Sequence, residues 1–282
     1  MDTQKVWFIT GCSSGFGKAL SELLLKEGEL VVATARQLDS LLHLRALAKN
    51  PKQLLTLALD VTKTDQIQAA VTTAISHFGR IDVCVNNAGY GAVGALEEVS
   101  EKEIRAVFDT NVFGLIEVSR AITPYFRKQK SGRFINLSSV AGMVALPGAS
   151  IYAATKFAVE GFSEALAGEL APFGVKLTII EPGGVRTEFA NRSLKVAPYH
   201  PDYSEALAVS RKYYETIGGN QPGDPVACAK LMMEIGRHPN PPLRLIMGKI
   251  ALGRVEKKLE EYAKEREVWR EQTLLTDFPE FR

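Results

Sequence analysis

A tyrosine and a lysine lie four residues apart near the middle of the chain, Tyr152 and Lys156, at the start of a segment with helical periodicity. Residues i and i+4 share one face of a helix, so both side chains can reach the same ligand. A free phenol has a pKa of about 10 and is a poor acid or base at neutral pH, but a nearby ammonium favours the phenolate and lowers that pKa. Although the spacing alone is common by chance, the pair is a candidate for proton transfer.

Two serines follow an apolar segment shortly before this tyrosine. Ser138 and Ser139 come directly after residues 134–137, and Ser139 precedes Tyr152 by thirteen positions. The ligand-binding loops of α/β sheets lie at the carboxyl ends of the strands. A serine hydroxyl is therefore expected to join the tyrosine and the lysine at one site.

A glycine-rich turn near the N-terminus is a candidate phosphate site. It lies between a predicted strand and a helix-forming run, where free backbone N–H groups and the positive end of a helix dipole can hold a pyrophosphate. We expect Gly11 to permit the turn, Gly15 to let phosphates approach the backbone, and Gly17 to let helix and strand pack closely. Such turns alone are weak evidence, because a plain strand-to-helix connection has the same composition. The turn consists of Thr10, Gly11, Cys12, Ser13, Ser14, Gly15, Phe16 and Gly17.

The end of the second predicted strand, residues 30–35, indicates which dinucleotide this turn would bind. An Asp or Glu there accepts a hydrogen bond from the ribose 2′-OH of NAD(H). In this chain Ala35 occupies that place and Arg36 follows it, with a planar guanidinium that suits a 2′-phosphate. The pattern predicts NADP(H) over NAD(H). The alternatives for Arg36 are a solvated side chain ahead of a helix and a side chain that stacks on adenine.

The elements that must position these residues follow an alternating pattern. Short apolar runs rich in β-branched residues alternate with longer segments of helical period, which is typical of βαβ units. They predict a Rossmann-type α/β fold, a doubly wound seven-stranded parallel sheet with helices on both faces in three α/β/α layers. The predicted strands are 5–10, 30–35, 54–59, 81–86, 133–137, 175–181 and 243–247, and the predicted helices are 15–27, 38–49, 64–78, 101–128, 151–172, 224–237 and 254–272.

The length of 282 residues fits one domain with additions or two domains. The continuous order of elements favours a single domain over 1–282. Its additions would be a substrate-binding loop and helix insertion at about 186–223, where Pro and Gly break any long helix, and a C-terminal helical extension at about 254–282. For that extension we expect a solvated helix that docks one apolar stripe, with a lid or a subunit interface as the alternatives.

Charge and composition exclude several classes of protein. A net charge of +2 gives no field that would recruit nucleic acid or an anionic membrane. No apolar run approaches the roughly 18 residues of a membrane span, and the N-terminus lacks a signal-like segment, so we expect a cytoplasmic protein. The three cysteines and four histidines show no metal-ligand spacing, so no metal is expected.

In their order along the chain, these motifs resemble those of the short-chain dehydrogenase/reductase family, from residue 5 to about residue 190. The glycine-rich turn resembles the family's Thr-Gly-x-x-x-Gly-x-Gly motif, and further matches follow it in the family's order. These matches are Asp60-Val61, which contacts adenine in the family, Asn86-Asn87-Ala88-Gly89 after the fourth predicted strand, and a segment that closes over the nicotinamide, with Pro182, Gly183, Val185 and Thr187.

The resemblance implies a catalytic tetrad of Asn111, Ser139, Tyr152 and Lys156. Tyr152 would give a proton to a carbonyl oxygen while the nicotinamide delivers hydride. Lys156 would lower the pKa of Tyr152 and bind the nicotinamide ribose, and Ser139, selected over Ser138 by its spacing, would hold the carbonyl oxygen. Asn111 would bind a water of a proton relay, unless it is an ordinary helix residue.

Together, the motifs and the resemblance predict an NADPH-dependent carbonyl reductase that acts reversibly on a fairly apolar ketone or aldehyde. Two alternatives are a non-catalytic NADPH-binding regulator and an epimerase or dehydratase on a related fold. Small residues along 151–172 allow a homo-oligomer, although internal packing would explain them equally well. The expected substrate-pocket walls are Tyr90, Val140, Met143, Leu146, Val185, Phe189 and a tyrosine-rich loop that contains Tyr199, Tyr203, Tyr213 and Tyr214.

Overall fold

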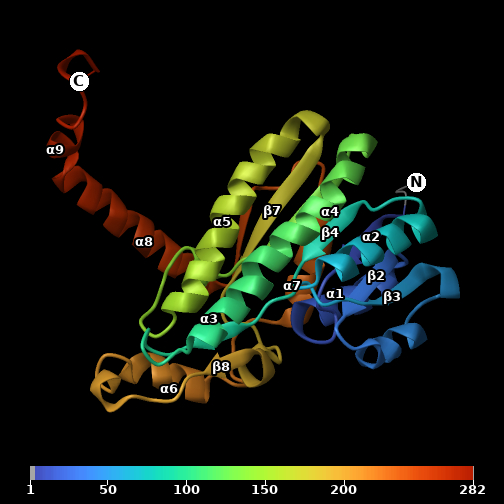
Figure 1. Ribbon diagram of the computed structural model, residues 1–282, viewed down its shortest axis with the longest axis horizontal. Helices are drawn as coiled ribbons and strands as arrows, with labels where there is room; N and C mark the ends of the chain where they lie inside the picture. The colour runs from blue at the N-terminus through green and yellow to red at the C-terminus, as the bar shows by residue number, and fades with distance from the viewer. Residues whose placement is uncertain (1–3, 282) are drawn as a thin grey trace.

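A parallel sheet with helices on both faces forms the centre of the structure, a computed structural model that describes residues 4–281 (Figure 1). The seven-stranded sheet has the order β3-β2-β1-β4-β6-β7-β9, and each neighbouring pair is parallel. This architecture confirms the predicted fold class. The strands are β1 (Val6–Ile9), β2 (Leu30–Ala35), β3 (Leu54–Ala58), β4 (Val83–Asn86), β6 (Gly132–Leu137), β7 (Val175–Pro182) and β9 (Arg244–Met247).

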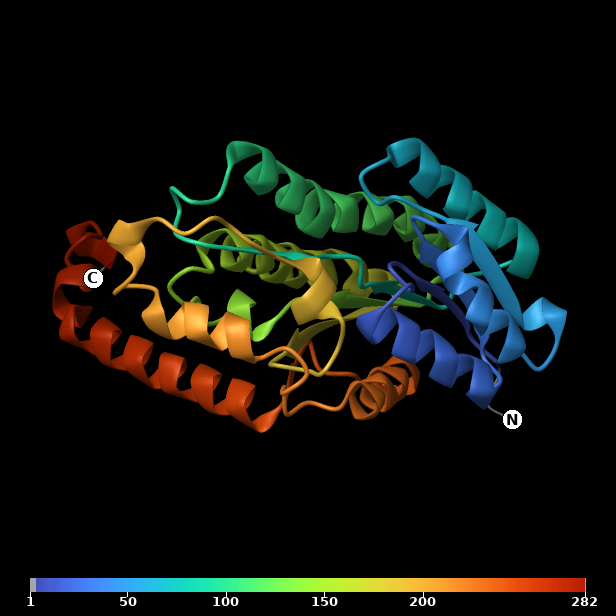
Figure 2. The ribbon, with the colours of Figure 1, turned by 90° about the horizontal axis from the view of Figure 1, so that it is seen from below.

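Helices cover both faces because the strands are apolar on both sides. In β1, Val6 and Phe8 belong to one buried cluster and Trp7 and Ile9 to another, as the alternation of side chains along a strand requires. The first cluster packs against α2 (Thr64–Phe78), α4 (Gly114–Gln129) and α5 (Ser150–Leu170). The second packs against α1 (Gly15–Glu27) and α7 (Pro225–Arg237), on the opposite face of the sheet (Figure 2).

The strand order reverses next to β1, whose neighbours are β2 on one side and β4 on the other. The connections from these strands therefore leave in opposite directions. Ligands of open α/β sheets bind in the crevice beyond the carboxyl ends of the strands at such a point. The fold thus places the glycine-rich turn, which follows β1, at the position where a dinucleotide binds.

Two predicted helices differ from the expectation. Residues 38–49 form a 3₁₀ helix over Leu38–Ala46, in which the buried Leu41 and Leu44 share one face because this helix has three residues per turn. The helix predicted over 101–128 is divided into α3 (Glu101–Phe108), a π-helical turn (Asp109–Phe113) and α4. Hydrophobic periodicity does not reveal this interruption, since the chain stays helical through it.

The segment 186–223 has little regular structure, as its Pro and Gly residues predict. It holds a π-helical turn (Phe189–Ser193), the short strand β8 (Leu194–Val196) and α6 (Ala208–Thr216). Strand β8 pairs with β5 (Gly91–Val93) in a separate two-stranded sheet. This sheet was not predicted, because strands of three residues are too short to show a period.

The C-terminal extension begins earlier than predicted, with α8 (Lys249–Val268), and continues as α9 (Arg270–Leu274). Within α8 only Ala251 and Val255 are buried, and both helices extend away from the sheet (Figure 1). Among the helices of residues 4–281, none combines the length and hydropathy of a membrane span. We propose that the chain forms one domain with these two additions.

Candidate active site

A cavity of about 350 Å³ opens at the carboxyl ends of the central strands. It is lined by most of the residues that the sequence singled out, from the glycine-rich turn to Thr187. Five predicted residues do not line it: Gly17, Asn111, Met143, Tyr199 and Tyr203. Those that do are Gly11, Ser13, Ser14, Gly15, Phe16, Arg36, Asp60, Val61, Asn87, Ala88, Gly89, Tyr90, Ser139, Val140, Leu146, Tyr152, Lys156, Pro182, Gly183, Val185, Thr187, Phe189, Tyr213 and Tyr214.

Hydrogen bonds between the ends of β1 and β4 hold the glycine-rich turn in place. The Thr10 hydroxyl accepts hydrogen bonds from the backbone N–H groups of Asn87 and Ala88, at 2.9 and 3.0 Å. In return, Nδ2 of Asn87 donates to the carbonyl oxygens of Thr10 and Gly11, at 2.7 and 3.0 Å. Gly11 has a φ of 72°, a left-handed conformation that a side chain would strain.

The N-terminus of α1 fits a phosphate group. Its N-cap Ser14 makes no side-chain capping bond within the described chain, and the first turn carries no acidic residue. Gly15 has a φ of 56°, and the nearest atom to an added Cβ would be Cβ of Thr187, at 3.8 Å. The helix therefore presents unpaired N–H groups to open space, which is the arrangement that binds the pyrophosphate of a dinucleotide.

Gly17 does not line the cavity but lies where α1 packs against the glycine-rich turn. A Cβ at Gly17 would lie 2.5 Å from the carbonyl oxygen of Gly11 and 2.6 Å from Nδ2 of Asn87. Neither contact can be relieved easily, because the first atom is backbone and the second is held by two hydrogen bonds. The absence of a side chain at this position lets α1 approach the turn.

Gly17→Ala is expected to lower the free energy of unfolding by about 2 kcal/mol, since overpacking against backbone costs this much. It should also weaken dinucleotide binding by displacing the turn. Denaturant unfolding and cofactor titration measure both effects. Gly253→Ala is the matched control, because an added Cβ at this position in α8 meets nothing within 4 Å. Equal stabilities of the two variants would contradict the close approach.

Arg36 and Asp60 flank the part of the cavity next to β2 and β3. Arg36 is exposed and makes no hydrogen bond or ion pair within residues 4–281, and Ala35 before it is buried. Oδ1 of Asp60 accepts hydrogen bonds from the backbone N–H and the hydroxyl of Thr62, at 3.0 and 2.8 Å. The carboxylate is thus oriented from one side, and the guanidinium is free to bind an anion.

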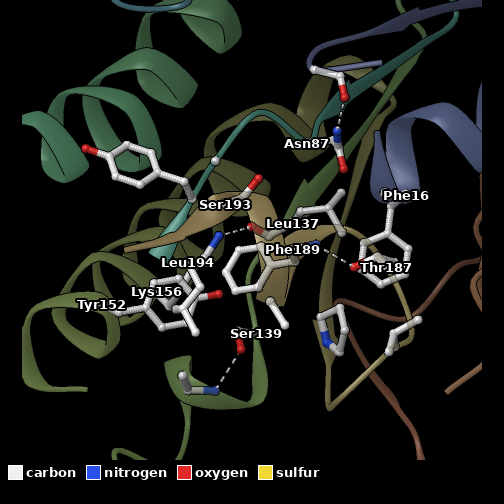
Figure 3. A pocket seen from close by; sticks show the side chains of 18 of the residues that line it. Phe16, Asn87, Leu137, Ser139, Tyr152, Lys156, Thr187, Phe189, Ser193 and Leu194 are labelled. Carbon is white, nitrogen blue, oxygen red and sulfur yellow. Dashed lines mark hydrogen bonds between the residues drawn. The ribbon is translucent and has the colours of Figure 1, made fainter. Parts of the chain in front are cut away.

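Tyr152, Lys156 and Ser139 converge beside Phe189 (Figure 3). Nζ of Lys156 lies 5.8 Å from the centroid of the Tyr152 ring and donates a 2.8 Å hydrogen bond to the carbonyl oxygen of Leu137. The ring of Phe189 lies 5.9 Å from that of Tyr152. A helix, the loop after β6 and the segment after β7 therefore contribute to the same part of the cavity.

Burial dominates the ionisation of both catalytic candidates. It raises the pKa of Tyr152 to about 12, although a hydrogen bond with Ser139 acts in the opposite direction. Burial also lowers the pKa of Lys156 to about 8, partly offset by the carboxylate of Glu160. The expected lowering of the Tyr152 pKa by Lys156 is therefore not seen here, because desolvation of the phenol outweighs the other effects. Tyr152 keeps its proton at neutral pH, as a proton donor must.

The two serines differ in their neighbours. The Ser139 hydroxyl caps the short 3₁₀ turn Val140–Gly142 by accepting from the N–H of Ala141, at 3.1 Å, and it also bonds Tyr152. The hydroxyl of Ser138 is buried and has no hydrogen-bond partner among the described residues. This arrangement favours Ser139, and not Ser138, as the hydroxyl that faces a substrate.

Asn111 lies behind the cavity in the π-helical turn and is buried. Its Nδ2 donates to the carbonyl oxygen of Tyr90 and the hydroxyl of Thr155, at 2.8 and 3.1 Å, while Oδ1 accepts from the N–H of Tyr90 at 3.0 Å. Both amide protons are thus engaged, so a relay water would need Oδ1 or the backbone carbonyl oxygen. A Cβ at Gly89 would lie 3.0 Å from this Oδ1, which explains the glycine there.

The substrate end of the cavity differs from the prediction in part. Met143 does not line it, whereas the neighbouring Val144 does. Tyr213 and Tyr214, which belong to the tyrosine-rich loop expected at this end, also line the cavity. The sequence missed other residues of the 186–223 segment and one of α8, which approach the cavity only through the folding of the chain: Leu194, Ile217, Gln221 and Arg254.

A buried carboxylate cluster behind Lys156 was also missed. Arg244 places Nε 3.0 Å from Oε2 of Glu160 and 3.7 Å from Oε1 of Glu181, and it bonds Glu164 at 2.6 Å. Burial raises the pKa of Glu160 and raises that of Glu181 from its usual 4.5 to about 7. Within residues 4–281 no cluster of acidic, histidine or cysteine side chains is suited to a metal ion.

Glu181→Gln is expected to stabilise the protein at alkaline pH. Between pH 4.5 and about 7 the unfolded chain loses the Glu181 proton while the fold retains it, so the free energy of unfolding falls as pH rises. At pH 8 the variant should be more stable by about 2 kcal/mol, with little difference at pH 4.5. Urea unfolding at both pH values measures this, with Glu164→Gln, at the exposed partner of Arg244, as the control. If the Glu181→Gln variant is less stable than the wild type at pH 8, the ion pair between Glu181 and Arg244 stabilises the fold instead.

Comparison with known proteins identifies the family. The family model described as short chain dehydrogenase matches residues 5–196. The chain belongs to the short-chain dehydrogenase/reductase family. Two similar curated proteins are "Oxidoreductase BOA17" of Botryotinia fuckeliana, 37% identical over 96% of this chain and 98% of that protein, and "3-ketodihydrosphingosine reductase" of Bacteroides thetaiotaomicron, 37% identical over 86% and 88%.

Solved structures of short-chain dehydrogenases share the fold over nearly the whole chain. A short-chain dehydrogenase from Streptomyces avermitilis is 38% identical, with a TM-score of 0.89 over 97% of this chain and 100% of that one. A Burkholderia phymatum short chain dehydrogenase/reductase in complex with NAD is 28% identical, with a TM-score of 0.81 over 94% and 96%. This member of the short-chain dehydrogenase/reductase family is thus an oxidoreductase that acts on carbonyl or alcohol substrates, and NAD(P)(H) is the cofactor typical of the family.

Proposed function

We propose that this short-chain dehydrogenase is an NADPH-dependent reductase of fairly apolar ketones or aldehydes. The observation that carries the proposal is the convergence of Tyr152, Ser139 and Lys156 in the same cavity as the α1 N-terminus. The reaction is reversible, so the enzyme is also an alcohol dehydrogenase in the other direction.

Each catalytic residue has one task in this proposal. Tyr152 would give its phenolic proton to the substrate oxygen, and the bound nicotinamide cofactor would supply the hydride that the carbonyl carbon takes up. Ser139 donates a hydrogen bond to the same oxygen and thereby orients it. Lys156 holds the ribose next to the nicotinamide and restores the proton of Tyr152, and Asn111 keeps the loop at Tyr90 in place through the hydrogen bonds described above.

Residues around the cavity would bind the cofactor along its length. The N–H groups of α1 would hold the pyrophosphate, Asp60 and Val61 the adenine, and Arg36 the 2′-phosphate. The β4 end, with Asn87, Ala88 and Gly89, and the segment from Pro182 to Thr187 would enclose the nicotinamide side. The absence of a carboxylate at Ala35, together with the unpaired Arg36, supports NADP(H) over NAD(H).

The apolar walls at the substrate end of the cavity support an apolar carbonyl compound as the substrate. Its walls include Val93, Val140, Val144, Leu146, Phe189, Leu194 and Ile217. Homo-oligomer formation remains part of the proposal, because Ala154, Gly161, Ala165 and Gly168 lie exposed on α5, where internal packing does not account for them.

A screen of NADPH oxidation against steroid, aliphatic, aryl and sugar ketones tests this function. We expect turnover of apolar ketones and none of sugars, with NADPH preferred to NADH. Tight NADPH binding without turnover of any compound would favour a non-catalytic regulator. A preference for NADH would refute the assignment of the cofactor while leaving the reaction in place.

A further inference from the structure

Arg254 lines the cavity although it belongs to the C-terminal extension, on α8. It lies between Ala251 and Val255, the two residues of α8 that are buried. A Cβ at Gly183 would come within 3.0 Å of Cβ of Ala251, so this turn of α8 packs directly on the segment after β7. The position of Arg254 at the cavity is therefore fixed by the core.

Arg254 is half-buried, and its guanidinium makes no hydrogen bond or ion pair among residues 4–281. The other partly buried arginines of the described chain all have a partner: Arg211 bonds Glu98, Arg237 bonds Glu29, Arg244 bonds Glu160, and Arg133 donates to the carbonyl oxygen of Ile235. Removing a cation from water without a partner is costly. An unpaired half-buried arginine in a ligand cavity therefore points to an anion supplied by the ligand.

The remaining walls contain no protein group that could neutralise this charge. Among the described residues that line the cavity, Asp60 is the only acidic one, and it follows β3 at the opposite end of the sheet from α8. Arg254 instead shares the cavity wall with Tyr213 and Tyr214 of α6, and Oη of Tyr213 would lie 3.3 Å from a Cβ at Gly184, next to the Gly183 on which α8 packs. The arginine thus belongs to the substrate end of the cavity.

From this geometry, and resting on the proposed reductase function, we infer that the substrate is an oxo carboxylic acid with an apolar chain, bound through its carboxylate by Arg254. A planar guanidinium forms two parallel hydrogen bonds with a carboxylate. The single positive charge of Arg254 matches the single negative charge of a carboxylate, whereas a phosphate dianion would need a second cation. The apolar walls suit the chain between the carboxylate and the carbonyl group that faces Tyr152.

Straight-chain oxo acids of increasing length, each compared with its methyl ester, test this assignment. The ester keeps the chain and the ketone but removes the charge. We expect kcat/KM of the wild type to favour one or more of the acids over their esters by about 10-fold or more, as a charged hydrogen bond provides. Arg254→Gln should abolish that preference by raising KM for the acid, with the ester unchanged.

Lys258→Gln is the matched control, because it removes the same charge from an exposed position one turn further along α8. It should keep the preference for acids. Equal reduction of acids and esters by the wild type, or an unchanged preference in Arg254→Gln, would overturn the inference while leaving the reductase function intact. A raised KM for NADPH in Arg254→Gln, with the acid preference intact, would assign this arginine to the cofactor instead.

Affinities of the acids and esters, measured without turnover, distinguish failure of this inference from failure of the reductase function. If the wild type reduces neither acids nor esters, calorimetry on the Tyr152→Phe enzyme saturated with NADP⁺ measures their affinities without turnover. If acids bind more tightly than esters, and if this difference disappears when Arg254→Gln is added to Tyr152→Phe, the carboxylate site is supported. The assigned reaction alone would then be wrong. Equal affinities for acids and esters would overturn it.

Discussion

Tyr152→Phe is expected to lower kcat for ketone reduction by about 10³-fold or more, because the variant keeps the ring and loses the proton that the carbonyl oxygen must receive. The Kd of NADPH should stay within a few-fold, since the phenol is at the reaction centre and away from the α1 N-terminus. Single-turnover kinetics for the chemical step and fluorescence titration for NADPH measure the two quantities separately.

Tyr125→Phe is a suitable control for this prediction, because Tyr125 lies on α4, packs against the core and does not line the cavity. Its activity should equal that of the wild type. Near-normal turnover in Tyr152→Phe would refute the role of the phenol as proton donor. A large loss of NADPH affinity would instead mean that Tyr152 mainly holds the cofactor.

Arg36→Asp is expected to change the NADPH/NADH ratio of kcat/KM by about 10²-fold or more towards NADH. The substitution removes a charged hydrogen bond to the 2′-phosphate, places a negative charge beside that group and offers an acceptor for a 2′-OH. Steady-state kinetics with both cofactors and one ketone measure the ratio directly. The effect should weaken as salt increases, because Arg36 is exposed.

Arg45→Asp makes the same change of charge at an exposed position that does not line the cavity. It should leave the ratio unchanged. An unchanged ratio in Arg36→Asp would refute the phosphate role. An equal loss of affinity for both cofactors would favour the alternative in which Arg36 stacks on adenine.

The sequence by itself determined the fold and most of the residues that line the cavity. The seven strands of the main sheet were predicted within two residues of their observed ends, because a strand buried on both faces is a continuous apolar run. The glycine-rich turn and the Tyr152–Lys156 pair were visible for a related reason. Their spacing is set by one turn or one helix, so neighbours in sequence are also neighbours in space.

Only the tertiary structure decided which distant residues meet at the cavity. The cluster of Glu160, Glu181 and Arg244 joins a helix to two strands, and Arg254 reaches the substrate end from a helix about a hundred residues beyond Tyr152. The burial that holds the proton on Tyr152 likewise comes from packing. No local period encodes such contacts, because they depend on how segments far apart in the sequence pack against one sheet.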